Sequence, residues 1–239
     1  MIRLVVLDMA GTTVADDGLV EQAFTRAIGE VGVARSDERF PGMLALVRRT
    51  MGESKISVFR ELLGDEAAAR RANSAFETAY GDSIADGGCR PVDGAREVIE
   101  QLRDAGVLVA LTTGFSAATQ QQLLTGLGWQ DLVDLALTPA QAGRGRPYPD
   151  LVLTSLLRLG VDDVREVAVA GDTAGDIRSA VRAGAGIAAG VLTGAHGRQQ
   201  LREAGATHVL GSVRELPAHV LGTTELRQDF SGTGPRAAR

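Results

Sequence analysis

Short polar segments next to apolar runs hold the side chains that could do chemistry in this chain. Asp8 ends the first apolar run, Thr113 follows a second, and Asp172 follows a later one with Asp176 four residues beyond it. Arg146 lies in a glycine- and proline-containing segment ahead of a predicted helix. A carboxylate can attack phosphorus in line, and Mg²⁺, which prefers hard oxygen ligands, can neutralise the repulsion between carboxylate and phosphate. Together these residue types are typical of a phosphoryl-transfer site.

A lysine adds a second kind of chemistry, because Lys55 is the only lysine among 25 basic residues. Ser54 is a good N-cap residue, so Lys55 is expected in the first turn of a helix. There the helix dipole disfavours an ammonium group and favours the neutral, nucleophilic amine. Lys55 is therefore a candidate for covalent catalysis, with an ordinary surface lysine or an electrostatic substrate contact as the alternatives.

The elements that must position these residues alternate between strands and helices. Apolar runs without period-two alternation, typical of strands covered on both faces, occupy residues 4–7, 107–112, 132–137, 167–170, 190–193 and 208–210. Helical patterns with start and stop signals lie between them at 93–106, 116–126 and 149–160. The alternation predicts an α/β fold with a doubly wound parallel sheet, in which ligands bind outside the carboxyl ends of the strands.

One long segment, residues 16–88, contains no convincing strand and interrupts this alternation. The spacing of its apolar residues predicts helices over 20–31, 41–51, 54–64 and 65–80. We expect a core domain of residues 1–15 and 89–221, with residues 16–88 forming a small all-helical cap domain inserted after the first strand. The polar stretch 222–239 is expected to be a flexible C-terminal tail.

Composition narrows the class of protein. The chain has 239 residues, 44% of them hydrophobic, and a net charge of −5, which argues against a disordered chain and against a basic nucleic-acid-binding protein. Its single cysteine, Cys89, excludes an internal disulfide framework and, with the lack of a signal-peptide pattern, favours the cytoplasm. No apolar run approaches the ~18 residues of a membrane span. The expected partner is a small molecule, not a membrane or a nucleic acid.

Four motifs, in the correct order, resemble those of the haloacid dehalogenase superfamily: DMAGT at 8–12, TTG at 112–114, RPYP at 146–149 and GDTAGD at 171–176. Further segments resemble its phosphonatase group, which comprises phosphonoacetaldehyde hydrolase and its relatives. They are Ala10, MGESK at 51–55, RPVDG at 90–94 and GRPYP at 145–149. The resemblance extends to about residue 215 and implies the superfamily's Rossmann-like core with a type-one helical cap.

The resemblance implies the nucleophile and the metal ligands. Asp8 would be the nucleophile that forms an aspartyl-phosphate, and it would also bind Mg²⁺. The backbone carbonyl of Ala10 and the carboxylate of Asp172 would be further ligands, and Asp176 would support the metal mostly through waters. The family also implies a homodimer assembled through cap helices.

The phosphoryl group would be held by separate residues. Thr113 and the Gly114 amide would bind its oxygens, and Arg146 would grip it bidentately where most superfamily members use lysine. Arg144 is a rival two residues away, but the proline that follows Arg146 favours the latter. The remaining candidates for substrate contact are the turn residues Gly11 and Thr12, which expose backbone N–H groups, and Gly52 in the cap.

Position 10 separates two reactions. Superfamily phosphatases usually carry an aspartate there, which protonates the departing alcohol and is worth ~10²–10⁴ in rate. Ala10 cannot donate that proton. A phosphonate whose leaving carbon adjoins a carbonyl can instead pass its electrons to an iminium formed with Lys55, which matches the Schiff-base lysine of phosphonatase. The resemblance therefore implies C–P hydrolysis of a carbonyl phosphonate, phosphonoacetaldehyde or a relative.

Two other functions stay open. The first is a phosphatase or phosphotransferase for a small phosphate ester, with Lys55 binding substrate electrostatically and the substrate or the cap supplying the acid. The second is a binding or regulatory protein that kept the fold, although Asp8, Thr113 and Asp172 are intact. The chain departs from the phosphonatase pattern at two places, with Val58 replacing a histidine and 18–19 (GL) replacing a cysteine. These departures favour a related substrate or a slower variant of the chemistry.

Overall fold

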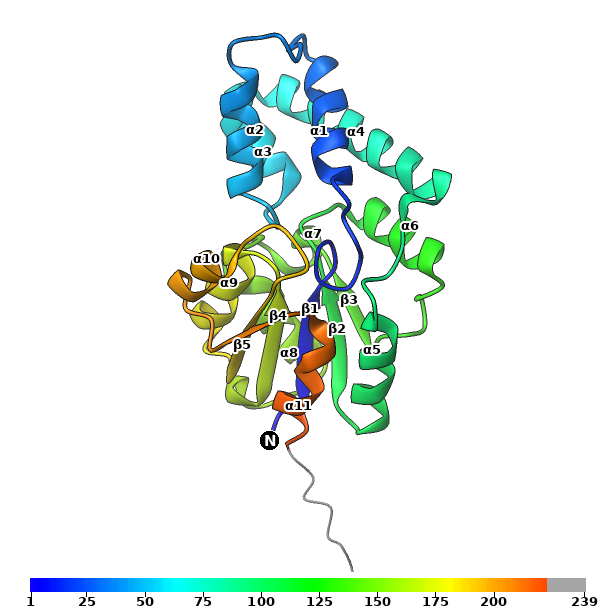
Figure 1. Ribbon diagram of the computed structural model, residues 1–239, viewed down its shortest axis with the longest axis vertical. Helices are drawn as coiled ribbons and strands as arrows, with labels where there is room; N and C mark the ends of the chain where they lie inside the picture. The colour runs from blue at the N-terminus through cyan, green and yellow to red at the C-terminus, as the bar shows by residue number, and fades with distance from the viewer. Residues whose placement is uncertain (223–239) are drawn as a thin grey trace, which may run out of the picture.

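A six-stranded parallel sheet forms the centre of the protein, in the order β3-β2-β1-β4-β5-β6 (Figure 1). The computed structural model describes residues 1–222, so the predicted tail lies, from residue 223 on, outside the described residues. The strands are β1 (Leu4–Asp8), β2 (Leu108–Thr112), β3 (Leu135–Leu137), β4 (Val167–Gly171), β5 (Ile187–Val191) and β6 (His208–Leu210). This order confirms the predicted α/β fold with a doubly wound parallel sheet.

Each face of the sheet has its own apolar core. Val5 and Leu7 of β1 belong to a cluster that includes α5 (Ala95–Asp104), α6 (Ala117–Leu127) and α11 (Leu216–Val220). Leu4 and Val6 belong to a second cluster, with α8 (Asp150–Arg158), α9 (Ala174–Ala183) and α10 (Arg198–Glu203). Since both faces are covered, the central strands need apolar residues at every position, which explains their continuous apolar runs.

Two strands differ from their predicted ranges. The fifth run was expected at 190–193, but β5 is Ile187–Val191, because its small residues pair with β4 from Ala168 to Gly171. The residues after Val191 leave the sheet and form a loop at its carboxyl edge. The third run was expected at 132–137, yet only Leu135–Leu137 pairs with β2. In both cases the first and last residues of the strand are determined by pairing with the neighbouring strand, and a local sequence pattern contains no information about that pairing.

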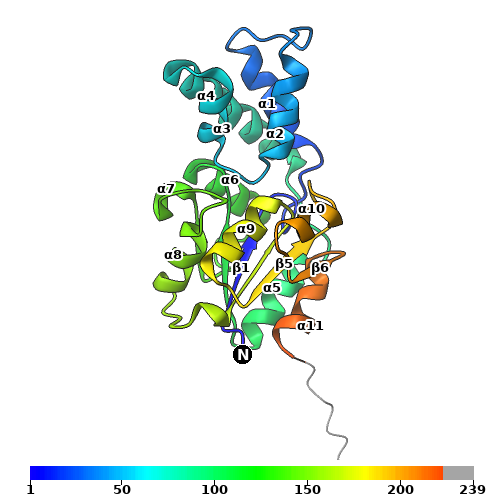
Figure 2. The ribbon, with the colours of Figure 1, turned by 90° about the vertical axis from the view of Figure 1, so that its left-hand side faces the viewer.

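Four helices lie together beyond the carboxyl ends of the strands, at the end of the molecule opposite the N terminus (Figures 1 and 2). They are α1 (Leu19–Gly29), α2 (Phe40–Arg49), α3 (Lys55–Leu63) and α4 (Glu66–Ser83), and α4 continues into a π-helical turn at Ile84–Gly88. Both α1 and α3 pack against α4. We propose that residues 16–88 form the cap domain, because these helices add no strand to the sheet. None of the helices within residues 1–222 has the length and apolar character required to cross a membrane.

Aromatic rings connect these helices to the strands. Phe24 of α1 stacks on Phe59 of α3 at 5.9 Å, and Phe76 of α4 stacks on Tyr80 at 5.8 Å. Tyr80 in turn lies 4.7 Å from Phe115, which follows β2. Such pairs contribute about 0.5–1.5 kcal/mol each beyond the area that they bury. The stack therefore fixes α4 over the end of β2. The short elements of the chain are α7 (Pro139–Ala142) and the 3₁₀ turns Val164–Glu166 and Val213–Glu215.

Candidate active site

Neighbouring strand ends bring the predicted site residues together. Asp8 is the last residue of β1, and the register pairs it with Thr112 at the end of β2. Asp172 follows β4, which pairs with β1 on its other side. Parallel strands end at a common edge, so residues that are far apart in the sequence meet there.

Three buried carboxylates lie at the centre of this edge. Asp8, Asp172 and Asp176 each offer an oxygen within 4.8 Å of the others. Burial raises the pKa of Asp8 well above its usual value, although Arg146 opposes the shift. Burial and the charge of Asp176 together raise the pKa of Asp172 to about 7. A divalent cation relieves such repulsion, and carboxylate oxygens are the ligands that Mg²⁺ prefers, so this donor set fits Mg²⁺.

Asp176 is fixed by the start of α9. Thr173 occupies the N-cap, where its hydroxyl and its amide both donate to Asp176 Oδ2, at 2.5 and 3.1 Å. The amide of Asp176 donates back to the Thr173 hydroxyl at 3.2 Å. Asp176 is therefore a capping carboxylate in the first turn of α9, and it also belongs to the carboxylate cluster. The sequence suggests both positions, one at a helix start and one beside a metal site.

Arg146 supplies the positive charge inside the cluster. Its guanidinium contacts Asp8 at 2.8 Å and Asp176 at 2.5 Å, and it donates to the Thr112 hydroxyl at 2.7 Å. Its rival Arg144 is instead exposed and paired with an aspartate of α8. Of these two arginines, Arg146 alone reaches the carboxylates, and its side chain is 3% exposed. A single guanidinium leaves the three carboxylates with an excess of negative charge, which again fits a divalent cation.

The loop after β5 contributes residues that sequence reasoning did not identify as functional. The Ala195 amide of this loop donates to the Asp172 carboxylate at 2.7 Å. The same carboxylate accepts the hydroxyl of Thr12, a predicted site residue after β1, at 3.3 Å. His196 Nδ1 accepts the Ala174 amide at 2.8 Å, which leaves Nε2 to donate to a backbone carbonyl of α2 at 3.3 Å. Backbone donors carry no side-chain signal. The only available clue was the position of this loop after an apolar run.

A cavity of 690 Å³ opens between the sheet edge and the helices α1–α3. It brings together most of the predicted site residues: Asp8, Ala10, Gly11, Gly52, Lys55, Thr113, Gly114 and Asp172. Thr12 is buried behind this wall, and Arg146 lines an adjoining cavity of 480 Å³ that Lys55 and Gly114 also line. Asp176 lines neither of these cavities, since it lies beneath Arg146.

Lys55 begins α3, with Ser54 at the N-cap position as predicted, although the Ser54 side chain caps no amide. Burial lowers the pKa of Lys55, against the opposing charges of Asp16 and Asp8. Its Nζ lies 5.4 Å from the centre of the Phe115 ring. Desolvation is therefore the main reason for a more neutral amine, in place of the helix dipole that the sequence suggested.

The chain matches the family described as haloacid dehalogenase-like hydrolase over residues 2–184. That range is more than half of the chain and includes all four motifs. The chain belongs to the haloacid dehalogenase-like hydrolase family. The predicted resemblance to this superfamily is thus confirmed, and the protein is a hydrolase of this family.

Individual relatives of this haloacid dehalogenase-like hydrolase carry two kinds of name. Phosphonoacetaldehyde hydrolase of Parabacteroides distasonis is 28% identical over 154 residues, which are 54% of this chain and 57% of that protein. Probable phosphatase IndB of Dickeya dadantii is 27% identical over 226 residues, 91% of this chain and 94% of that protein. A crystal structure of a phosphonoacetaldehyde hydrolase-like protein from Oleispira antarctica matches with a TM-score of 0.80 and 23% identity, over 92% of this chain and 91% of that chain. At this identity the structural likeness concerns the fold.

Proposed function

We propose that this hydrolase cleaves the C–P bond of a small carbonyl phosphonate through an aspartyl-phosphate on Asp8, with Mg²⁺ as cofactor. The observation that carries the proposal is that the Asp8 carboxylate and the amine of Lys55 line one cavity. Ala10, on the same wall, has no proton to give a leaving alcohol. The pairing of a nucleophile with an amine, without that acid, favours a phosphonate over a phosphate ester.

The residues around Asp8 would prepare the phosphoryl transfer. Thr113 and the Gly114 amide line the cavity beside Asp8, where phosphoryl oxygens can accept hydrogen bonds. Arg146 contacts the Asp8 carboxylate and can bind a phosphoryl oxygen with the same guanidinium. Asp8, Asp172 and the Ala10 carbonyl would hold Mg²⁺, which would supply positive charge against the repulsion between carboxylate and phosphoryl group. The Asp8 carboxylate would attack phosphorus in line.

Lys55 would make the carbon a leaving group. Its neutral amine condenses with the substrate carbonyl, and uptake of one proton gives an iminium cation and a molecule of water. As Asp8 attacks, the C–P bond breaks and its electron pair moves into the iminium, which becomes a neutral enamine on Lys55. No proton donor is required at position 10 for this step, in agreement with Ala10. Water then releases phosphate from Asp8 and the carbonyl product from Lys55.

A phosphatase for a small phosphate ester is the second candidate, in which Lys55 binds the substrate by charge alone. One observation favours it. Val58, one turn after Lys55, is a buried apolar residue, so α3 offers no proton-transferring group at that position.

Borohydride trapping separates the two candidates. Phosphonoacetaldehyde and sodium borohydride are added to the protein, and the modified residue is located by mass spectrometry. We expect one adduct on Lys55, the only lysine of the chain, and none in Lys55→Arg, which keeps the charge but lacks the amine. Phosphate release from phosphonoacetaldehyde is expected to disappear in the same variant. Release at the wild-type rate by Lys55→Arg would exclude the covalent role of Lys55, and hydrolysis of phosphate esters without any adduct would favour the phosphatase.

A further inference from the structure

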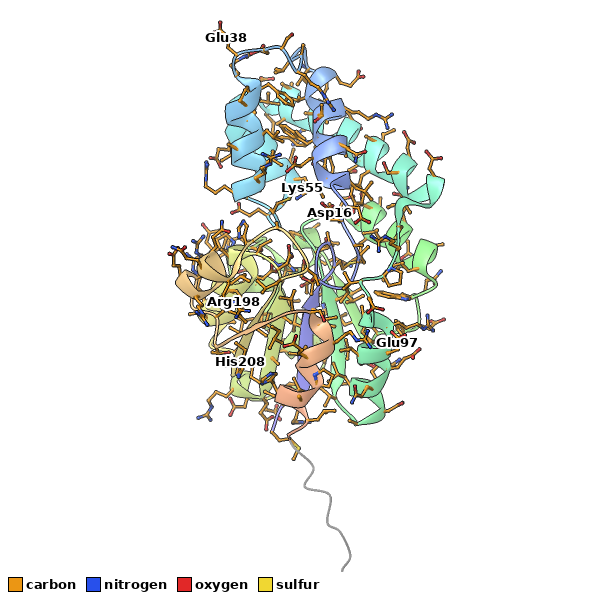
Figure 3. All side chains as sticks on the ribbon, in the orientation of Figure 1. Asp16, Glu38, Lys55, Glu97, Arg198 and His208 are labelled. Carbon is orange, nitrogen blue, oxygen red and sulfur yellow. The ribbon has the colours of Figure 1, made fainter. Side chains whose placement is uncertain are left out.

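Two oppositely charged side chains in the cavity have no ion-pair partner within residues 1–222. Asp16 lies just before α1, Lys55 begins α3, and both line the cavity (Figure 3). The other charged residues of the wall, apart from those of the carboxylate cluster, are paired: Glu21 with Arg48, Asp17 with Arg90, and Asp93 with Arg214. Asp16 and Lys55 are therefore available to a bound substrate.

The surroundings of Asp16 favour its protonated form. Its Oδ1 accepts the Val20 amide at 3.2 Å, which fixes the carboxyl group at the start of α1. Burial is the largest influence and raises the pKa of Asp16, while the Val20 amide and Lys55 from α3 lower it and Asp17 from the same loop raises it. Asp16 in turn raises the pKa of Tyr80 from α4, whose hydroxyl is buried without a hydrogen-bond partner among residues 1–222. The partly buried carboxyl can thus hold a proton at a higher pH than an exposed one.

The surroundings of Lys55 offer few other acids. The Phe115 ring, which lies next to the Lys55 amine, is apolar. Val58, one turn further along α3, is also apolar and is buried. Asp8 also raises the pKa of Lys55. Its carboxylate, however, contacts Arg146 and is needed as the nucleophile. Glu53 also raises the pKa of Lys55, and it lines the adjoining cavity together with Lys55 but not the cavity that holds Asp8. Among the acidic residues of the described chain that line the cavity with Asp8, Asp16 alone is neither paired with an arginine nor part of the carboxylate cluster.

We propose, building on the Schiff-base function above, that Asp16 is the general acid for imine formation at Lys55. The neutral Lys55 amine bonds to the carbonyl carbon, and a proton passes from nitrogen to the carbonyl oxygen to give a carbinolamine. Asp16 then donates its proton to that hydroxyl, the C–O bond breaks, and water leaves while the nitrogen lone pair forms the C=N bond. The products are an iminium cation on Lys55 and the Asp16 carboxylate beside it, so charge and atoms balance.

The test compares two neighbouring aspartates in the full-length protein. Asp16→Asn keeps an oxygen that can accept the Val20 amide but cannot give a proton. Asp17→Asn keeps the acid of Asp16, and it removes the exposed pair with Arg90 and one charge that raises the pKa of Asp16. Phosphonoacetaldehyde and borohydride are used to follow the rate of adduct formation against pH. We expect Asp16→Asn to slow trapping by about 10²-fold and to abolish the decline at alkaline pH, where Asp16 loses its proton. Asp17→Asn is expected to keep the wild-type rate of trapping while Asp16 is protonated and to shift the alkaline decline to lower pH, because Asp17 raises the pKa of Asp16.

Further measurements decide between a chemical and a structural effect. Asp16→Glu retains the acid and is expected to recover trapping, while beryllium fluoride with Mg²⁺ should raise the melting temperature of all variants equally through Asp8. Equal trapping by Asp16→Asn and wild type would overturn the role of Asp16 and leave that of Lys55 standing. Loss of trapping in both Asp16 variants would also overturn it, because the acid would then make no difference. A wild type that forms no adduct would overturn the role of Lys55 and that of Asp16 together.

Discussion

At the scale of the residue, burial determines which of several similar side chains can do chemistry. Arg144 and Arg146 are two residues apart, yet the first pairs with a surface aspartate and the second bridges buried carboxylates. Lys55 and Asp16 are each partly buried, and for each the loss of water is the largest influence on its pKa. Desolvation pushes an amine and a carboxyl group in opposite directions, and both shifts favour the neutral forms that imine formation requires.

The shift of Lys55 can be measured directly, because it is the only lysine. Protein labelled with ¹³C-lysine gives one set of lysine signals, and its chemical shift against pH reports the titration of the amine. Because burial lowers the pKa, we expect the midpoint below the usual value of 10.5, so that more of the amine is neutral at a given pH. A midpoint at or above 10.5 would contradict burial as the source of a reactive amine.

At the scale of the element, the segment between α2 and α3 lies directly on the strand ends. The carbonyl of Gly52 accepts a hydrogen bond from Arg146 at 3.2 Å. Gly114, after β2, lies so close to this segment that a Cβ atom there would clash with the Glu53 carbonyl oxygen. His196 adds a hydrogen bond to the end of α2. These contacts join the helices to the catalytic edge, so the position of Lys55 depends on a close backbone approach.

Gly114→Ala is expected to separate this segment from the core. The new methyl group cannot fit against the backbone of Glu53, so the segment must move and carry Lys55 away from Asp8. We expect an increase in KM and a loss of Lys55 trapping, measured by steady-state kinetics and borohydride labelling.

The matched control for Gly114→Ala is Gly42→Ala. Gly42 lies in the exposed first part of α2, with nothing within 4 Å of an added Cβ. Alanine there is expected to leave activity unchanged and to raise the free energy of unfolding by about 0.5–1 kcal/mol. Wild-type kinetics in Gly114→Ala would show that the close approach is not needed.

At the scale of the whole molecule, negatively charged side chains gather at the carboxyl edge of the sheet, where the two apolar cores and the helices α1–α4 exclude water. Three of the 30 acidic residues, Asp8, Asp172 and Asp176, are all at least 96% buried, as their exposed fractions of 4%, 2% and 1% indicate. Arg146 is the cation that lies among them. The fold therefore depends on a charge balance at its functional centre. The homodimer and the cytoplasmic location stay predictions.

Removal of Arg146 tests this balance through global stability. Arg146→Ala leaves three buried carboxylates without their cation, and breaking a buried pair from one side costs about 3–5 kcal/mol. We expect that loss in the free energy of unfolding, measured with denaturant in the presence of a chelator. Mg²⁺ is expected to restore part of it, because a divalent cation offsets the same charge.

Arg144→Ala is the control for that measurement, since its guanidinium is exposed and its ion pair is screened by water. Its melting temperature is expected to match that of the wild type. Equal stability of Arg146→Ala and wild type would show that the carboxylates are neutralised in another way.

The amino-acid sequence by itself determined the sheet, the order of the motifs and most of the residues on the cavity wall. Apolar runs, glycine turns and helix caps are local properties, so they identify β1, β2 and β4 and the residues that follow them. The rule that ligands bind at the carboxyl edge then brings Asp8, Thr113 and Asp172 together before any coordinates are known.

Only the tertiary structure decided which charges are paired and which are free. Nothing in the local pattern distinguishes Asp16 from Asp17, yet Asp17 pairs with Arg90 and Asp16 lines the cavity near Lys55. The Ala195 amide likewise reaches Asp172 only because β5 ends beside β4. Burial and pairing are set by residues distant in the chain, and a pattern of near neighbours contains no record of them.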